Sequence, residues 1–532
     1  MAQFTSDTFD ASARIPRSRI RADEDHATEP SDSSLKTLLA AVTAVLRSSL
    51  PAQPTVSRST IDVILGSPRR ELRGLPLPIL AAYTAAVVWS LIRSGQASQA
   101  ARLVDREGLE LLKSGAVSAP PATESVCYSV MASAYLLTGR CSEGAYSAQI
   151  ARDYAAEADD DACRFLALGL SAASLAVSGE FSTAAGLLGS ARELGAAHGW
   201  GSGAWPLVLA SVLIDYRRGD ADGIQAALES LGGNGTRDVV DRAVLTIGGI
   251  WLHGARADYR EMAAAARSAT HGVGRRLFPP FFADLAASLE CLALEQLGDP
   301  VSALKVIAGR PSPQGHSVCF ELHRATIHLQ LGEPKEALRA TETCVSSCPN
   351  HNLRSLPSVL LRRAVAYELM GRSSSADAEF SRASHLAARL GGVAPTVGLR
   401  LGIMKALYTR LLVNEPAFGE AIAERLLSTG SYPDPDPLSH VRVRLTGREA
   451  VLAEWLTTGM TFNEISEHLH VSVNTLKTQA RSLYSKFGVS SRDDVVAIME
   501  RDGLFRNIQL DPQPCGSAKA LKPRDGAGGP RS

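Results

Sequence analysis

A pair of small residues at a fixed spacing recurs along most of this chain. Five glycines each end a stretch of helical periodicity, and another Gly or an Ala follows each of them five positions later. These pairs are Gly139 and Gly144, Gly179 and Ala184, Gly298 and Ala303, Gly332 and Ala337, and Gly371 and Ala376. Paired helices approach closely only where side chains are small, and a Gly between them permits a left-handed turn. The spacing therefore predicts a repeat of helix pairs.

More small residues extend the repeat in both directions from these turns. They stand seven positions before the turn glycines and seven positions after three of the second small residues: Ala132, Ala172, Cys291, Ala325 and Ala364, then Ala151, Ala191 and Ala383. Adjacent turns lie 34 to 40 residues apart, which resembles the tetratricopeptide repeat family with its period of 34. The Trp, Tyr and terminal Pro positions of that family are mostly unmatched. The alternative is a generic α-helical bundle in which Ala and Gly recur by composition.

Composition supports helices over sheets. Hydrophobic residues make up 45% of the 532 residues, but aromatic residues only 5%, and a chain rich in Ala and Leu favours closely packed helices. From Leu35 to Gly430 the pattern predicts successive amphipathic helices of about 12 to 20 residues. We therefore expect an all-α fold in which a tetratricopeptide-like solenoid with a concave face occupies residues 35–430.

The remaining segments differ in composition from the repeats. Residues 1–34 mix Ser, Asp, Arg and Pro and are predicted to form a disordered tail. Residues 431–444 contain three alternating prolines, which predict an extended linker. Residues 445–505 form a separate domain, and residues 506–532 are predicted to be a second disordered tail.

Charge, apolar stretches and cysteines limit where the protein acts. Lys plus Arg and Asp plus Glu both count 55, so any attraction to DNA must come from a local patch. Two uncharged stretches, Leu75–Ile92 and Leu194–Ile214, are interrupted by Pro or Gly, which argues against a membrane span. The eight cysteines have no framework spacing and the chain has no signal peptide. A cytoplasmic protein without membrane contact is expected.

The sequence predicts no catalytic or metal site. Cys344, Cys348 and His351 are close in sequence, but no fourth ligand is apparent and Pro349 simply ends the helix. We therefore expect core cysteines and no bound metal. Neither a G-x-S-x-G motif nor a defensible pair of carboxylates occurs, so no enzyme activity and no cofactor are expected.

Four helix starts are marked within residues 445–505. Thr446 and Thr461 begin capping boxes, and Ser472 and Ser491 supply two further caps. Apolar residues follow each cap at helical spacing. They are Val451, Leu452, Trp455 and Leu456, then Ile465 and Leu469, then Leu476, Ala480, Leu483 and Phe487, and finally Val495, Val496 and Met499. This pattern predicts a compact domain of four helices.

The third of these helices has a polar face suited to DNA. Only three residues separate it from the second helix, as a helix-turn-helix requires. Its polar stripe contains no acidic residue and consists of Asn474, Lys477, Thr478, Arg481 and Ser485. Lys and Arg donate to guanine in the major groove, and Thr contacts bases through its methyl or hydroxyl group. The domain nevertheless has six basic and eight acidic residues, so the positions of the charges decide its attraction to DNA.

The motifs of this domain resemble the LuxR/NarL family of bacterial regulators. They run from Leu445-Thr446-x-Arg448-Glu449 through Val471-Ser472-x-x-Thr475-Leu476-Lys477 to Lys486-Phe487-Gly488-Val489-x-Ser491-Arg492. Gln479 stands where the family usually has His, and it could alter base preference. Phe462 replaces a usual polar residue and could itself cap the core or lie against the DNA backbone.

The resemblance implies roles for individual residues. Lys477, Thr478 and Arg481 align with base-facing positions, and Asn474 shares their stripe. Lys486 and Thr461 align with DNA-backbone contacts, and Ser485 is assigned with them. The last helix aligns with the family's dimerisation helix, with Val495, Val496 and Met499 as its contact residues. A homodimer on double-stranded DNA is expected.

Long members of this family, such as MalT-like regulators, place a nucleotide-binding module before helical repeats and a DNA-binding domain. No P-loop motif occurs in this chain, and neither a phosphate-accepting receiver nor a lactone-binding α/β domain is indicated. The repeats are therefore the expected sensor for a small molecule or protein. The alternative is an interaction scaffold whose DNA-binding domain is weak or vestigial.

Overall fold

The computed structural model divides the chain into two compact units, Met1–Pro437 and Leu438–Ser532, here called the N-terminal and C-terminal units. Within residues 32–510 it describes all but 52–56, 67–75, 109–118, 201–203, 233–238, 272–277, 347–350, 391–398, 400, 421–443, 446, 470, 488 and 502–508. The boundary between the units falls inside the predicted linker. The linker itself, apart from Arg444, lies outside the described residues.

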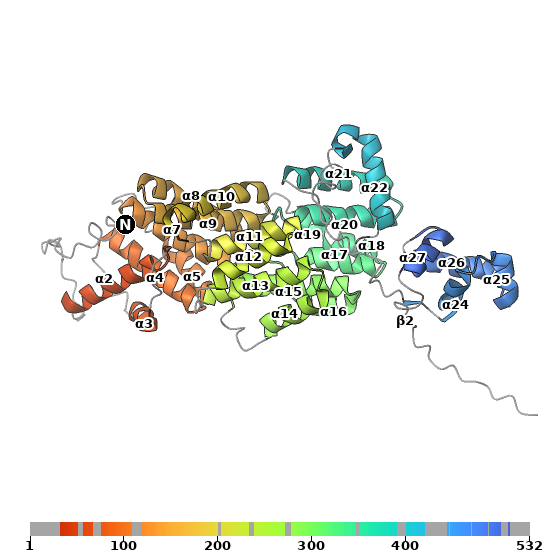
Figure 1. Cartoon of the computed structure of the whole chain (residues 1–532), viewed down its shortest axis with the longest axis horizontal. Coiled ribbons are helices and arrows are strands. Elements are labelled where there is room, and N and C mark those ends of the chain that lie inside the picture. Colours follow the sequence, from red (N-terminus) through yellow and green to blue (C-terminus); the bar gives the residue numbers. More distant parts are fainter. Residues whose placement is uncertain are drawn as a thin grey trace, which may run out of the picture. The chain divides into compact units, whose positions relative to one another are not determined.

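Helices make up the N-terminal unit, coloured red to cyan in Figure 1. In chain order they are α2 (Asp32–Arg47), α3 (Arg58–Gly66), α4 (Leu77–Arg93), α5 (Ala97–Leu103), η2 (Val104–Gly108), α7 (Pro121–Leu137), α8 (Cys141–Glu157), α9 (Asp161–Ser178), α10 (Phe181–His198), α11 (Trp205–Arg218), α12 (Ala221–Gly232), α13 (Val239–Ala255), α14 (Tyr259–His271), α15 (Pro280–Gln296), α16 (Pro300–Ile307), η4 (Gln314–His316), α17 (Phe320–Gln330), α18 (Pro334–Ala340), α19 (Glu342–Ser346), α20 (Leu356–Leu369), α21 (Ser373–Arg389) and α22 (Leu401–Asn414). This confirms the all-α helical-repeat fold.

The turns that join the helix pairs share one geometry. All five predicted turn glycines have positive φ, between 70° and 96°. Three further turns, which were not among those predicted, place Gly95, Gly219 and Ala257 in the same conformation. In each of these eight turns the N–H of the next residue donates to the carbonyl oxygen five positions earlier, at 2.7–2.9 Å. This is the Schellman closure of a helix end, and it repeats along the unit.

The predicted small residues lie where the paired helices meet. Gly144 is buried, and none of the predicted Ala and Cys positions is more than 1% exposed. In the three additional pairs larger residues occupy the equivalent buried positions, with Val88, Val212 and Ile250 seven residues before the turn. Gly95 with Ala100 fits the predicted spacing and was missed, whereas Ile224 and Met262 stand five residues after the other two turns. A search for small residues could not find those two pairs.

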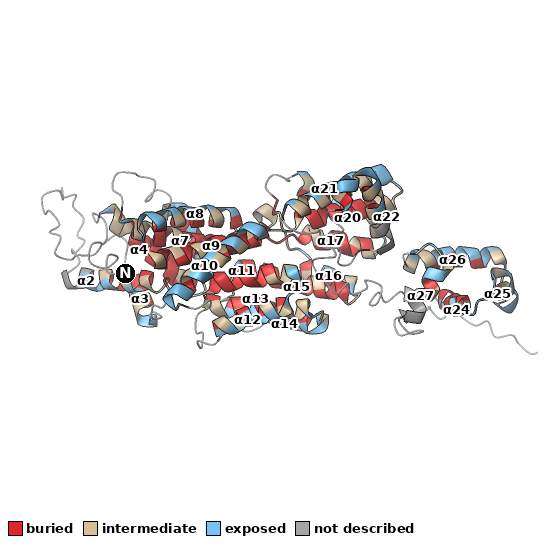
Figure 2. Cartoon of the chain, turned by 45° about the horizontal axis from the view of Figure 1, so that its top comes forward, coloured by how far each residue is buried: buried red, intermediate tan, exposed pale blue. Residues whose placement is uncertain are grey.

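The two helices of a pair have different surroundings. The first helices, such as α9, α11 and α15, are buried on most sides, whereas second helices such as α10 and α14 bury one face only (Figure 2). A helix that is apolar nearly all round must be covered all round, while an amphipathic helix can face water. The unit therefore has an inner layer of first helices under an outer layer of second helices.

The inner helices also pack against one another across the array. Helix α4 contacts α13 and α7 contacts α15, and one apolar core runs from Leu38 to Ile327. A second core covers the region from Ala325 to Leu411. The expected open concave face is therefore filled by the protein's own side chains between α4 and α15.

One contact joins residues that are 175 positions apart. The Asn352 side-chain amide donates to the Val177 carbonyl at 3.2 Å, and the Arg354 N–H donates to the Ser178 carbonyl at 3.1 Å. A Cβ atom on Gly179 would lie 2.4 Å from the Arg354 nitrogen. The segment before α20 is therefore seated on the turn between α9 and α10, which requires Gly179 both for its φ of 96° and for space.

Two observations concern the predicted tails. Helix α2 begins at Asp32, inside the predicted tail 1–34, because Asp and Ser suit a helix start as well as a flexible chain. The predicted tail 506–532 contains the two-residue strand β2 (Gln509–Leu510), which gains backbone hydrogen bonds from a parallel partner.

Helix α9 is long and apolar enough to cross a membrane, but 72% of that window is buried among other helices.

Candidate nucleic-acid interface

The C-terminal unit contains four helices, α24 (Gly447–Leu456), α25 (Phe462–Leu469), α26 (Val473–Phe487) and α27 (Arg492–Arg501), drawn in blue in Figure 1. Strand β1 (Arg444–Leu445) pairs with β2 in parallel. Each helix begins directly after its predicted cap. The core contains the predicted Leu452, Leu456, Ile465, Leu476, Ala480, Leu483 and Val495. Val451 was predicted to be in the core but is 41% exposed, because Ala453, on the other side of Leu452, takes the inward position.

Three of the caps are formed as the sequence predicts. The Thr461 N–H and hydroxyl donate to the Glu464 carboxylate at 2.7 and 2.9 Å, and these bonds lower the pKa of Glu464. The Ser472 hydroxyl accepts from the Thr475 N–H at 3.1 Å. The Ser491 hydroxyl accepts from the Asp494 N–H at 3.2 Å. These local bonds fix the starts of α25, α26 and α27.

The turn between α25 and α26 is short and anchored. The Val471 N–H donates to the Ser466 carbonyl at 3.2 Å, so the chain leaves α25 and enters α26 within a few residues. Phe462 packs against the core of the unit, which decides between the two roles expected for it. The two helices therefore form a helix-turn-helix, with α26 as its second helix.

The stripe predicted on α26 faces solvent. Asn474, Lys477, Thr478, Arg481 and Ser485 are all exposed. Within the described residues neither Lys477 nor Arg481 has an ion-pair partner, and no acidic residue stands on α26. The Thr478 hydroxyl donates to the Asn474 carbonyl at 3.0 Å, and its oxygen can still accept a hydrogen bond. Two cations and three small polar side chains thus remain available to a ligand.

Lys486, which was expected to contact the DNA backbone, is paired within its own domain. Its ammonium group lies 2.6 Å from the Glu449 carboxylate of α24, and its side chain is only 33% exposed. The Ser482 hydroxyl donates to the other oxygen of Glu449 at 2.7 Å. Glu449 was predicted to cap α24 with Thr446, which lies outside the described residues. Lys486 is therefore part of a largely buried ion pair that joins α24 to α26, and its predicted contact with the DNA backbone stays a prediction.

Arg492 fixes α27 to the end of α24, a role that the sequence did not reveal. Its guanidinium donates to the Leu456 carbonyl at 2.6 and 2.9 Å and also to the Met460 carbonyl. Leu456 ends α24, where carbonyl groups lack helical partners and attract cations. No local signal could indicate this bond, because 36 residues separate the two positions.

The predicted dimerisation residues of α27 do not share one environment. Val495 is fully buried in the core of its own unit, so it is not available to a partner, contrary to its predicted contact role. Val496 is half-buried against the same core. The Met499 side chain lies outside the described residues. A dimer contact through this helix would therefore rest on Val496 and the exposed positions beside it.

Residues 443–499, which span α24, α25, α26 and most of α27, match the family model described as bacterial regulatory proteins, luxR family. This part of the chain is a LuxR-type DNA-binding domain. A regulator of transcription is the class of protein that this domain supports. Among curated proteins no match to the chain is found.

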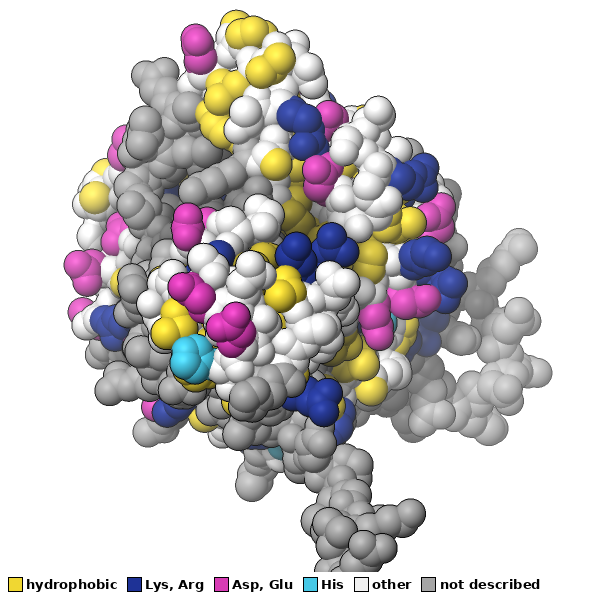
Figure 3. All heavy atoms as spheres, turned by 90° about the vertical axis from the view of Figure 1, so that its right-hand side faces the viewer, with side chains coloured by type: hydrophobic (Ala, Val, Ile, Leu, Met, Phe, Trp, Pro, Cys, Tyr) yellow, Lys and Arg dark blue, Asp and Glu magenta, His cyan; other side chains and the backbone are white. Residues whose placement is uncertain are grey.

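The described side chains on the face drawn in Figure 3 are mixed in charge. In Figure 3, basic side chains form small groups with acidic and apolar side chains beside them, and neither sign covers a continuous area. This agrees with the net charge of zero. Attraction of the LuxR-type domain to DNA must therefore come from its local cations, of which Lys477 and Arg481 stand on α26 without acidic neighbours on that helix.

Proposed function

We propose that this protein is a sequence-specific transcription regulator that inserts α26 into the major groove of DNA. The observation that carries the proposal is the exposed stripe of α26, on which Lys477 and Arg481 have no ion-pair partner among the described residues. Both side chains can donate to O6 and N7 of guanine. Asn474 can hydrogen-bond an adenine, and the methyl group of Thr478 can contact a thymine methyl.

DNA-backbone contacts would come from the edges of this surface. Thr461 and Ser485 are exposed, and the start of α25 presents backbone N–H groups of the kind that bind phosphate. We propose that two copies bind together through α27. Two copies would then occupy half-sites about one helical turn apart, roughly 10 base pairs.

For the N-terminal unit we propose a sensing role, as the helical repeats of MalT-like regulators would suggest. Because its inner face is filled between α4 and α15, a ligand or protein partner would bind elsewhere. One hollow of about 280 Å³ lies between α21 and α22, lined by apolar residues such as Phe380, Leu407 and Leu411 and by polar ones such as Ser381. We propose a cytoplasmic location and no catalytic activity.

Binding to labelled duplexes over a range of salt concentrations tests the DNA-binding proposal. We expect the logarithm of the association constant to fall linearly with the logarithm of salt concentration, and Lys477→Ala and Arg481→Ala each to reduce preference for the specific duplex. The exposed Arg448→Ala on α24 is the control, because it removes a cation outside α26. Equal discrimination by wild type and the two α26 variants would favour the interaction-scaffold alternative.

A second experiment addresses sensing. Genome-wide occupancy is compared between the full chain and a chain that lacks residues 35–430. Sensing predicts that growth conditions change the occupancy of the full chain but not that of the shortened one. Identical occupancy of both chains under all conditions would contradict it.

A further inference from the structure

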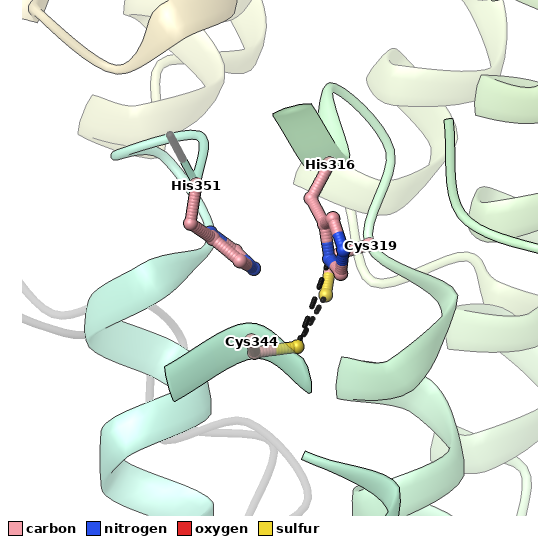
Figure 4. Close-up of side chains that lie close together, drawn as sticks. All are labelled: His316, Cys319, Cys344 and His351. Carbon is pink, nitrogen blue, oxygen red and sulfur yellow. Dashed lines mark hydrogen bonds between the residues drawn. The ribbon is translucent and has the colours of Figure 1, made fainter. Parts of the chain in front are cut away.

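Four metal-ligating side chains come together where the two cores of the N-terminal unit meet. His316 ends η4, Cys319 precedes α17, Cys344 lies on α19 and His351 precedes α20. One potential ligand atom from each lies within 4.8 Å of all the others. Figure 4 shows both imidazole rings directed toward the region of the two sulfur atoms. The sequence predicted no metal site because His316 and Cys319 are far from Cys344 along the chain. Cys348, which was considered with Cys344 and His351, lies outside the described residues.

The distances fit tetrahedral coordination. Zn–S bonds of about 2.3 Å and Zn–N bonds of about 2.0–2.1 Å place tetrahedral ligand atoms roughly 3.8 Å apart for two sulfurs and roughly 3.6 Å for sulfur and nitrogen. The Cys319 and Cys344 sulfurs are 3.7 Å apart, and the Cys344 sulfur is 3.6 Å from the His316 Nδ1. A disulfide would bring the sulfurs to about 2.05 Å.

The His351 ring has a buried nitrogen, Nε2, whose hydrogen-bonding position is vacant. Its Nδ1 lies 2.9 Å from the Asn352 carbonyl oxygen, so Nδ1 donates to that oxygen, and in the neutral ring Nε2 is the acceptor. That Nε2 is buried and has no hydrogen-bond partner. A buried acceptor without a partner is costly, and an imidazole held by a carbonyl through its other nitrogen is the usual arrangement of a metal ligand.

The backbone at His316 has an unusual conformation. His316 adopts a φ of 52°, a left-handed conformation uncommon for a residue with a side chain. The backbone of this segment is thus held in a conformation that directs His316 to the cluster.

A second buried cluster, Cys291, Glu295 and His323, differs because all of its imidazole nitrogens have hydrogen-bond partners. His323 Nδ1 lies 2.8 Å from the Glu295 carboxylate, and its Nε2 lies 2.7 Å from the Ser288 hydroxyl. Cys291 donates to the same carboxylate. Both imidazole nitrogens therefore have partners, in contrast to the vacant Nε2 of His351.

We propose that a structural Zn²⁺ ion joins α17, α19 and the start of α20, bound by a Cys₂His₂ set: His316, Cys319, Cys344 and His351. Four protein ligands leave no open position, as in structural rather than catalytic zinc sites. Both sulfurs bind as thiolates, and any thiol proton passes to solvent when the ion enters. The ion would also hold the segment 351–355 that is seated on the Gly179 turn.

The test is the metal content of the full chain purified under reducing conditions, together with Co²⁺ titration of the metal-free chain. We expect about one zinc ion per chain, and a Co²⁺ spectrum with tetrahedral d–d bands and thiolate charge transfer. Cys319→Ser with Cys344→Ser abolishes both signals. Cys127→Ser, which changes a buried cysteine outside the cluster, retains them.

A further variant keeps the test decisive if the double variant does not fold. His351→Gln removes the vacant Nε2, and we expect it to weaken Co²⁺ binding at least tenfold, because even second-shell changes cost about 10- to 100-fold. A folded, reduced wild-type chain that contains no zinc and gives no Co²⁺ spectrum would overturn the proposal. Isolation of a Cys319–Cys344 disulfide from anaerobically purified protein would also overturn it.

Discussion

Two arginine side chains, one in each unit of this protein, have opposite roles. Arg363 in the N-terminal unit is 7% exposed and donates to Glu379, Leu338, Thr341 and Tyr367. Arg481 in the LuxR-type domain is exposed and has no ion-pair partner among the described residues. The first cation is used to hold helices together, whereas the second remains available to a ligand.

This difference separates residues that maintain the fold from residues that bind DNA. Lys486 is the informative intermediate case, because it lies on the same helix as Arg481 but is paired with Glu449. Position on a recognition helix is therefore not sufficient to assign a DNA contact. The partner of each cation must be known as well.

The largest effect is expected for Arg363→Met. The change leaves the Glu379 carboxylate, whose side chain is 15% exposed, without its cation. Breaking a buried pair in this way costs about 3 to 5 kcal/mol of unfolding free energy. Hydrogen exchange in urea, followed separately in α20 and α26, measures the loss. Arg339→Met, at an ion pair whose Arg is 77% exposed, is the control and should cost under about 0.5 kcal/mol. Equal losses would show that burial does not distinguish these arginines.

Lys486→Ala should have the next largest effect, on stability first. Glu449 would remain largely buried and would lose its bond to the Lys486 ammonium group, while it keeps the bond from the Ser482 hydroxyl. Loss of a charged hydrogen bond costs about 1.5 to 3 kcal/mol. We expect faster hydrogen exchange in α24 and α26 without DNA. If Lys486→Ala leaves exchange unchanged but lowers the salt slope of DNA binding by about one, Lys486 contacts DNA as the family resemblance implied.

Lys477→Ala should do the opposite. Because the side chain is exposed and unpaired within the described residues, the unfolding free energy should change by less than about 0.5 kcal/mol. Loss of a base contact should cost about 1 to 3 kcal/mol at a specific site. Binding titrations with specific and scrambled duplexes measure it. A stability loss as large as that of Lys486→Ala would remove the distinction between the two lysines.

The local caps of the LuxR-type domain were predictable from sequence because each involves residues only three positions apart. Thr461 with Glu464 and Ser491 with Asp494 form as expected. The partner of Lys486 is 37 positions away, and Arg492 reaches Leu456 across 36. Nothing in the local sequence indicates which distant residue a side chain will meet. The exposed face of α26 followed from periodicity alone.

The same limit applied to the repeats and to the Cys₂His₂ cluster. Turn glycines followed by small residues were recognisable, whereas the turn at Ala257 has neither a Gly nor small neighbours at the expected positions. The filling of the inner face depends on contacts between α4 and α13. The cluster depends on Cys319 meeting Cys344, 25 positions later. Such contacts follow from how helix pairs stack, which the local pattern does not specify.

The smallest effect is expected for Thr461→Ala, and it should depend on pH. Removing this cap costs about 1 kcal/mol or less. Because the pKa of Glu464 is lowered in the folded protein, its contribution is complete above the ordinary pKa of Glu and is lost as pH falls through the lowered value. The variant keeps the backbone N–H bond to Glu464, so unfolding measured from neutral to acidic pH should show the difference between variant and wild type becoming smaller as the hydroxyl bond to the carboxylate is lost. A constant difference would show that Glu464 does not act through this cap.

The most direct test of the central claim is selection of DNA sequences from a random pool by the full-length protein. The wild type should enrich a motif, and Lys477→Ala with Arg481→Ala should lose enrichment at the base positions that these side chains contact. Arg448→Ala should retain the wild-type motif. Enrichment of the same motif to the same extent by the double variant would contradict the assignment of α26 as the helix that recognises DNA.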